Sequence, residues 1–158
     1  MPSSGKSTIG KIVADKIGFQ FIDLDAEIEK QEGKGLIEVL AEKGGIFLLD
    51  GEYEILRTVD PSIPTIISPA GSIIYHHAAM EWIREHCYTI FINAELEKIR
   101  ERLALTPKAI LGLKEKGLER LFEERHPEYA KAADVTIEAK DKLLKDIVSE
   151  AITHIKNE

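Results

Sequence analysis

The sequence predicts an α/β protein in which helices cover both faces of a parallel sheet. Short apolar runs rich in β-branched residues alternate along the chain with longer segments in which apolar residues recur every three or four positions. Strands that alternate with helices in this way form parallel sheets between two helical layers. The 158 residues contain no internal repeat and no linker rich in Pro, Gly or Ser. We therefore expect a single three-layer domain that spans residues 1–158.

The individual elements follow from periodicity and from turn residues. The expected strands are residues 19–23, 65–68, 88–94 and 135–139. The expected helices are residues 7–17, 35–43, 46–58, 76–86, 95–104, about 118–125 and 141–156. Gly44-Gly45 separates the second of these helices from the third, and the polar, lysine-containing stretch 105–117 is expected to be irregular.

Composition excludes several classes of function. The net charge of −7 argues against a nucleic-acid partner, because binding to the phosphate backbone requires a basic face. No apolar run reaches 18 residues and no charged-then-apolar leader is present, so neither a membrane span nor a signal peptide is expected. The single cysteine, Cys87, suits a reducing compartment. These features predict a cytoplasmic protein.

The first eight residues, MPSSGKST, contain the second half of a phosphate-binding loop, G-x-x-x-x-G-K-[ST]. In such loops backbone N–H groups surround the phosphates, the lysine neutralises their charge and the next hydroxyl binds Mg²⁺. The alternative is a simple helix cap, for which serine and glycine are also common. Because an amphipathic helix and then a strand follow, we interpret the segment as an ATP site formed by Ser4, Gly5, Lys6, Ser7 and Thr8.

The first glycine of this pattern would fall one residue before Met1. A phosphate loop normally joins a buried strand to the helix that follows it. We therefore expect an apolar strand that ends in glycine to lie upstream of Met1. Without such a strand, buried strand edges would be left unpaired, at a cost of about 1–3 kcal/mol for each backbone group.

The other motifs follow in a specific order: FIDLDAEIE, GEYEILR, ISPAGS, RERL and ERHPEYAKAAD. Together with GKST they resemble the shikimate kinases over nearly all 158 residues. The resemblance implies a P-loop kinase of the nucleoside-monophosphate-kinase type, with a five-stranded parallel sheet whose first strand this sequence lacks and a lid at about 104–118. It also implies a monomer that uses Mg²⁺ and ATP to phosphorylate the 3-hydroxyl of shikimate.

The resemblance further assigns roles to individual residues. Asp25 matches the aspartate that contacts the acceptor hydroxyl, and Asp23 the one that supports Mg²⁺ together with Ser7. Turn formation or helix capping is the alternative for both aspartates. Lys6 and Lys108 would hold the phosphates, so the expected catalytic residues are Asp25, Lys6 and Lys108.

Two arginines match those that bind the substrate carboxylate, which a guanidinium fork holds with two parallel hydrogen bonds. They are Arg57, whose spacing from Gly51 is one residue longer than usual, and Arg125. Gly71 completes the expected substrate site. Arg102 matches the arginine that packs against adenine, although a place on a helix surface fits it equally well.

The sequence also departs from the family. Ala70 and Ser72 flank Gly71 where three glycines are expected, and either Cβ would cost roughly 1–2 kcal/mol at a positive φ. Thr106 stands where the lid arginine is expected, which leaves Lys108, a candidate phosphate ligand or a solvated loop lysine, as the nearest cation. Two alternatives therefore stay open: a kinase for another hydroxy acid such as gluconate, and a nucleotide-binding module without catalysis.

Overall fold

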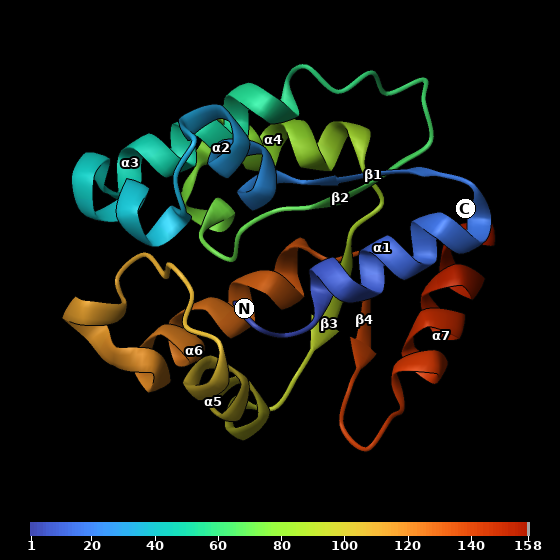
Figure 1. Ribbon diagram of the computed structural model, residues 1–158. Helices are drawn as coiled ribbons and strands as arrows, with labels where there is room; N and C mark the ends of the chain where they lie inside the picture. The colour runs from blue at the N-terminus through green and yellow to red at the C-terminus, as the bar shows by residue number, and fades with distance from the viewer. Residues whose placement is uncertain (158) are drawn as a thin grey trace.

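The computed structural model describes residues 1–157, and Figure 1 shows their arrangement. In chain order the elements are α1 (Lys6–Ile17), β1 (Gln20–Asp23), α2 (Leu24–Glu32), α3 (Leu36–Leu56), β2 (Thr65–Ser68), the 3₁₀ turn η1 (Ile73–Tyr75), α4 (His77–His86), β3 (Ile90–Asn93), α5 (Leu96–Leu105), α6 (Leu113–Ala132), β4 (Val135–Glu138) and α7 (Leu144–Lys156). The α/β class is confirmed, and the four expected strands are all present. No helix among the described residues has the length and apolar character needed to cross a membrane.

The strands pair in parallel but form two separate two-stranded sheets. β1 lies beside β2, with Gln20 opposite Thr65 and Asp23 opposite Ser68. β3 lies beside β4, with Ile90 opposite Val135. In Figure 1 the β1–β2 pair crosses the molecule above α1, whereas the β3–β4 pair runs steeply below it. A single parallel sheet was expected; the strand direction is confirmed, and the sheet is divided between β2 and β3.

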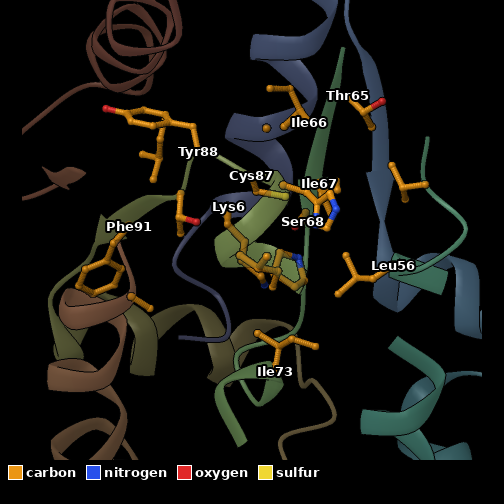
Figure 2. Close-up of a pocket in the computed structure, with 18 of the residues that line it drawn as sticks. Lys6, Leu56, Thr65, Ile66, Ile67, Ser68, Ile73, Cys87, Tyr88 and Phe91 are labelled. Atoms are coloured by element: carbon orange, nitrogen blue, oxygen red, sulfur yellow. The ribbon is translucent and has the colours of Figure 1, made fainter. Parts of the chain in front are cut away.

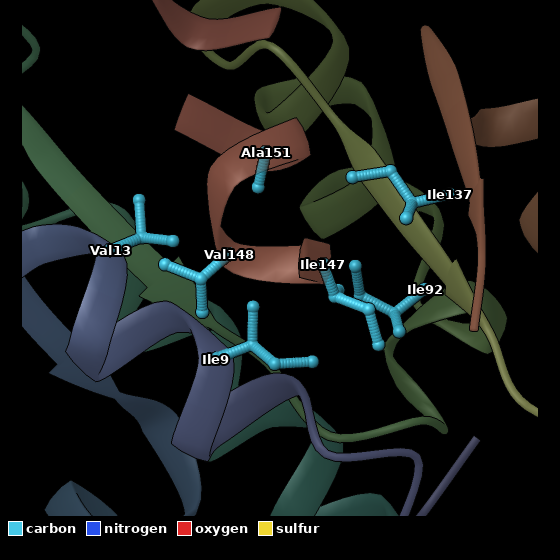
Figure 3. Packing of buried hydrophobic residues seen from close by; sticks show 7 residues of the cluster. All are labelled: Ile9, Val13, Ile92, Ile137, Ile147, Val148 and Ala151. Atoms are coloured by element: carbon cyan, nitrogen blue, oxygen red, sulfur yellow. The ribbon is translucent and has the colours of Figure 1, made fainter. Parts of the chain in front are cut away.

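Each strand pair has a helical cover of its own. The β3–β4 pair packs on α1 and α7 through the apolar cluster in Figure 3, whose members are Ile9, Val13, Ile92, Ile137, Ile147, Val148 and Ala151. The β1–β2 pair packs on α2, α3 and α4 through a second cluster, Leu24, Ile28, Ile55, Leu56, Ile73 and Ala79. Burial of apolar surface stabilises each half by roughly 25 cal/mol per Å² removed from water.

Two helices differ from the expectation. α2 was not predicted: Asp23 caps it by accepting a hydrogen bond from the backbone N–H of Ala26 (3.3 Å). α6 continues to Ala132, past the expected end near residue 125, although Pro127 removes one helical hydrogen bond. The break expected at Gly44-Gly45 is confirmed as a kink, since Gly44 has a φ of 81° and a ψ of 175°.

Candidate active site

The phosphate-loop residues lie at the N-terminus of α1. Gly5 adopts a left-handed conformation (φ 100°) that glycine enters without steric cost, and Lys6 is the first helical residue. The carbonyl of Gly5 accepts the first helical hydrogen bond, from the N–H of Ile9 (2.9 Å). Backbone N–H groups at a helix N-terminus, together with the helix dipole, attract phosphate. The loop can therefore bind a polyphosphate at this end of α1.

Arg102 on α5 forms a hydrogen bond with the phosphate loop. Its Nη1 atom donates a hydrogen bond to the carbonyl of Ser3 (3.0 Å). The backbone of Ser3 has a positive φ of 56°. A non-glycine residue in this conformation costs on the order of 1–2 kcal/mol, and the bond to Arg102 helps to offset that cost. Ser4 is buried, and Thr8 is exposed. Arg102 thus lies beside the nucleotide loop, as a residue that contacts the nucleotide would.

The carboxyl ends of β1 and β2 meet beside this loop. Ser7 on α1 and Ser68 at the end of β2 share a hydrogen bond between their hydroxyl oxygens (3.1 Å). Asp23 ends β1, and Asp25 lies in the first turn of α2. In parallel α/β proteins, ligands bind outside the carboxyl ends of the strands. Hydroxyl and carboxylate oxygens are also the ligands that Mg²⁺ prefers, so Ser7 and Asp23 fit an ion that keeps part of its water shell.

Lys6 and Asp25 influence each other electrostatically. Burial raises the pKa of the Asp25 carboxyl above its usual value, and the nearby ammonium of Lys6 opposes this rise. Burial likewise lowers the pKa of Lys6, against the opposing effect of Asp25. A carboxyl group whose pKa is raised by burial is a better proton acceptor than a solvated one.

A narrow cleft of about 20 Å³ brings five of the predicted site residues together, Lys6, Asp25, Gly71, Lys108 and Arg125. The residues that line it are Pro2, Lys6, Asp25, Ala70, Gly71, Ser72, Lys108, Ala109, Ile110, Leu111 and Arg125. They come from the phosphate loop, α2, the segment after β2, the segment between α5 and α6, and α6 itself. The volume is close to that of one water molecule and far below the roughly 300–1,000 Å³ of small-molecule sites. A substrate can therefore enter only if some of the segments that line the cleft move apart.

Arg125 is the most unusual side chain of this cleft, because only 1% of it is exposed. Its Nη2 atom donates to the carbonyl of Leu111 (2.5 Å) and its Nε atom to the hydroxyl of Tyr75 (3.2 Å), whose ring centroid is 5.1 Å from the guanidinium carbon. Among the described residues no carboxylate forms an ion pair with it. A buried charge is costly without a partner of opposite sign. The cleft thus presents a cation without a protein counter-charge.

Close packing around residue 71 leaves no room for a side chain, so glycine is required there. A Cβ on Gly71 would lie 2.8 Å from the hydroxyl of Tyr129, which donates a hydrogen bond to the Gly71 carbonyl (2.6 Å). Ala70 and Ser72 do not have a positive φ, so the steric strain considered for these two positions does not occur. The departure from three glycines therefore adds two small side chains to the cleft without straining the backbone.

Comparisons with known proteins show the family of this chain. A family model described as shikimate kinase matches residues 2–156. The chain belongs to the shikimate kinase family. It is 34% identical over 154 residues to a shikimate kinase from Persephonella marina, covering 97% of this chain and 93% of that protein. The fold matches a shikimate kinase from Aquifex aeolicus with a TM-score of 0.81 and 26% identity, over 99% of this chain and 93% of that one.

A second solved structure, of the shikimate kinase from Acinetobacter baumannii in complex with shikimate, gives a TM-score of 0.85. The identity is 22%, and the match covers 98% of this chain and 88% of that chain. At this identity the likeness concerns the fold. This chain therefore has the overall fold of that shikimate kinase, although its four strands form two separate pairs.

Arg57, a predicted substrate-binding residue, does not line the cleft. Its side chain is 58% exposed, and its Nη1 atom pairs with Glu54 on the helix surface (3.2 Å). The preceding residue, Leu56, is fully buried. Successive helical residues are rotated by about 100°, since 3.6 residues make one turn. The guanidinium of Arg57 therefore lies on the helix surface in this structure, and its role in substrate binding stays a prediction.

The sequence analysis missed Glu52, which supports the segment around Gly71. Glu52 is 1% exposed, and its Oε1 atom accepts a hydrogen bond from the N–H of Ala70 (2.5 Å). Burial raises the pKa of Glu52 to about 8, so the carboxyl group is mostly protonated at neutral pH. A signal was present in the sequence, because Glu52 shares a helical face with the apolar residues Ile55 and Leu56 at spacings of three and four.

Proposed function

We propose that this protein transfers the γ-phosphoryl group of ATP to the 3-hydroxyl of shikimate. The observation that carries the proposal is Arg125, a buried guanidinium without a carboxylate partner among the described residues, in the same cleft as Lys6 and Asp25. An acceptor with a carboxylate would supply the missing counter-charge, and its hydroxyl would lie between Arg125 and the phosphate loop. Membership in the shikimate kinase family supports this acceptor.

Ser7 and Asp23 would hold Mg²⁺, which neutralises charge on the phosphates when it is bound. Lys6 and the backbone N–H groups that follow Gly5 would hold the phosphates. Phosphoryl transfer passes through a loose transition state, so the protein contributes mainly positioning and charge stabilisation.

Asp25 would orient the acceptor hydroxyl and accept its proton. Its position beside Lys6 and the rise of its pKa on burial both support this role. Lys108 lines the cleft from the proposed lid, 104–118, and it is exposed in the present conformation. Closure of the lid over ATP would bring a positive charge to the transferring group. A lysine supplies that charge without the planar fork of an arginine.

ADP release from MgATP, with and without shikimate, tests the proposal. We expect shikimate-dependent turnover that falls by about 10²–10⁴-fold in Asp25→Asn, as for loss of a general base. Asp15→Asn is the matched control, because Asp15 is an exposed carboxylate on α1. Turnover with gluconate in place of shikimate would reassign the acceptor. ATP binding without turnover for either acid would instead support a non-catalytic role.

We further propose that the enzyme acts as a monomer in the cytoplasm. All residues of the cleft come from one chain, so a second copy is not needed to complete it. Sedimentation at the concentration used for the assay tests the monomer. A dimer that dissociates with loss of activity would contradict it.

A further inference from the structure

Tyr75 does not line the cleft at Arg125, yet it contacts the buried guanidinium from outside. The Nε atom of Arg125 donates a hydrogen bond to the Tyr75 hydroxyl (3.2 Å), and the guanidinium carbon lies 5.1 Å from the centroid of the tyrosine ring. Tyr75 is 47% exposed, so its ring contributes less to the apolar core than a buried aromatic residue does. The proposed catalytic steps give Tyr75 no role.

The 3₁₀ turn that carries Tyr75 is anchored at both ends. Ile73 begins η1 and is buried in the same apolar cluster as Leu56, and Figure 2 shows both side chains beside the apolar cavity between β2 and β3. His76 follows η1 directly, and its Nδ1 atom accepts a hydrogen bond from the N–H of Ala79 (3.1 Å), which caps α4. Packing and capping therefore fix the backbone position from which the Tyr75 side chain reaches Arg125.

The contact with Tyr75 determines which edge of the guanidinium faces the cleft. The five N–H groups of a guanidinium lie in one plane at fixed angles, so a bond at Nε also fixes the directions of both Nη atoms. The Nη2 atom of Arg125 donates to the carbonyl of Leu111 (2.5 Å), and Leu111 lines the cleft, whereas Tyr75 does not. The Nε edge is thus turned toward Tyr75, and the Nη2 atom lies on the side of the cleft.

A guanidinium without this contact would have to be ordered each time an acceptor binds. The arginine side chain has several rotatable bonds, and ordering it reduces the affinity for a ligand. A carboxylate can also pair with either of two edges, Nε with Nη2 or Nη1 with Nη2. A hydroxyl that occupies the Nε–H leaves the Nη atoms as the edge available to the carboxylate. The contact therefore preorganises the cation for one mode of carboxylate binding.

We propose that Tyr75 is a positioning residue, which holds the guanidinium of Arg125 so that its Nη atoms receive the carboxylate of the acceptor. This inference rests on the proposed function, because it assumes an acceptor that carries a carboxylate. Tyr75 acts through Arg125 and does not touch the reacting groups. The hydroxyl fixes Nε, and the negative face of the ring attracts the cation, so the two parts of the side chain can be tested separately.

Three variants test the proposal through the kinetics with shikimate. Tyr75→Phe keeps the ring and removes the hydroxyl, and Tyr75→Leu removes both. KM for shikimate should rise by about 3–10-fold in the first and by about tenfold or more in the second, while kcat and KM for ATP change by less than about twofold. Tyr53→Phe is the matched control, because Tyr53 stacks on His76 beside the same turn and its hydroxyl does not bond to Arg125 within residues 1–157. Equal rises in KM for Tyr75→Phe and Tyr53→Phe, or a fall in kcat without a rise in KM, would overturn the proposal.

The Nε–H group of Arg125 gives a second reading that needs no acceptor. Its ¹⁵N NMR signal is identified by its absence in Arg125→Lys. Exchange of this proton with water should be at least about tenfold faster in Tyr75→Phe than in the unmodified chain, and unchanged in Tyr53→Phe, because the Tyr75 hydroxyl accepts this hydrogen bond. Equal exchange in Tyr75→Phe and the unmodified chain would contradict the proposal. Faster exchange in Tyr75→Phe, together with no turnover of shikimate by the unmodified chain, would refute the proposed function and uphold the positioning of Arg125 by Tyr75.

Discussion

The nucleotide half and the acceptor half of the proposed active site are built in different ways. The nucleotide half is a continuous stretch, Ser4 to Thr8, whose backbone forms the site as soon as α1 begins. The acceptor half collects Asp25, Gly71, Lys108 and Arg125 from segments up to 100 residues apart. A local backbone structure is determined by a few residues, whereas a distributed site depends on the packing of every segment that contributes to it.

Lys6→Ala should have the largest effect, because it removes the cation of the nucleotide half. We expect kcat to fall by about 10²–10³-fold, as for loss of a preorganised group that stabilises transition-state charge. ADP release at saturating ATP and acceptor is the measurement. Lys11→Ala is the control, since Lys11 is an exposed lysine on the same helix. A similar loss in both variants would mean that helix stability, and not phosphate binding, is affected.

The substitution Arg125→Lys tests the acceptor half and keeps the positive charge at position 125. Loss of the guanidinium fork should raise KM for shikimate by about 10-fold or more, since a hydrogen bond to a charged group contributes roughly 1.5–3 kcal/mol. KM for ATP should change little. Arg120→Lys, at an exposed position on the same helix, is the matched control. Equal rises in both KM values would show that the two halves are not separable.

Glu52→Gln should change the pH dependence of stability. The pKa of Glu52 is raised to about 8 in the folded state, so the stability that its protonated form contributes is full below about pH 4.5 and is lost as pH rises toward 8. The amine of Met1, with its pKa lowered to about 4, has the opposite effect, and stability rises with pH between 4 and 8. The two slopes nearly cancel in the unmodified chain.

In the Glu52→Gln variant, only the increase in the free energy of unfolding with pH that is due to the Met1 amine remains. The free energy of unfolding of Glu52→Gln should therefore rise with pH between 5 and 7.5, by up to about 1.4 kcal/mol per pH unit. Urea unfolding across this range measures it. Glu54→Gln, an exposed neighbour on α3, should keep the nearly flat profile. A profile that rises equally in the unmodified chain would show that the carboxyl of Glu52 is charged in the folded protein.

Arg57→Ala should have the smallest effect. Its guanidinium forms only an exposed ion pair with Glu54, and such pairs contribute about 0–1 kcal/mol. We expect KM for shikimate to change by less than about twofold, against the larger change for Arg125→Lys. A tenfold rise in KM would mean that α3 turns when the substrate binds and brings Arg57 into the site.

Most of the elements could be predicted because their signals are local. The four strands lie where their apolar runs predicted, and Gly44 breaks α3 as expected. α2 was missed because a functional carboxylate was preferred for Asp23, and helix capping, which the structure shows, was kept only as the alternative. The end of α6 was expected near residue 125, whereas the helix continues past Pro127 to Ala132, with Leu121 and Arg125 buried.

The sequence alone therefore determined the α/β class and the family resemblance, because each strand, helix and motif behind them is formed by residues that are close together in the chain. Only the tertiary structure showed that Arg57 lies on the helix surface and that Arg125 is a buried cation, because helical phase and burial depend on contacts between distant segments. The division of the sheet between β2 and β3 was likewise evident only from the tertiary structure. The pairing of strands depends on the packing of the whole chain, and it cannot be predicted from a short stretch of sequence.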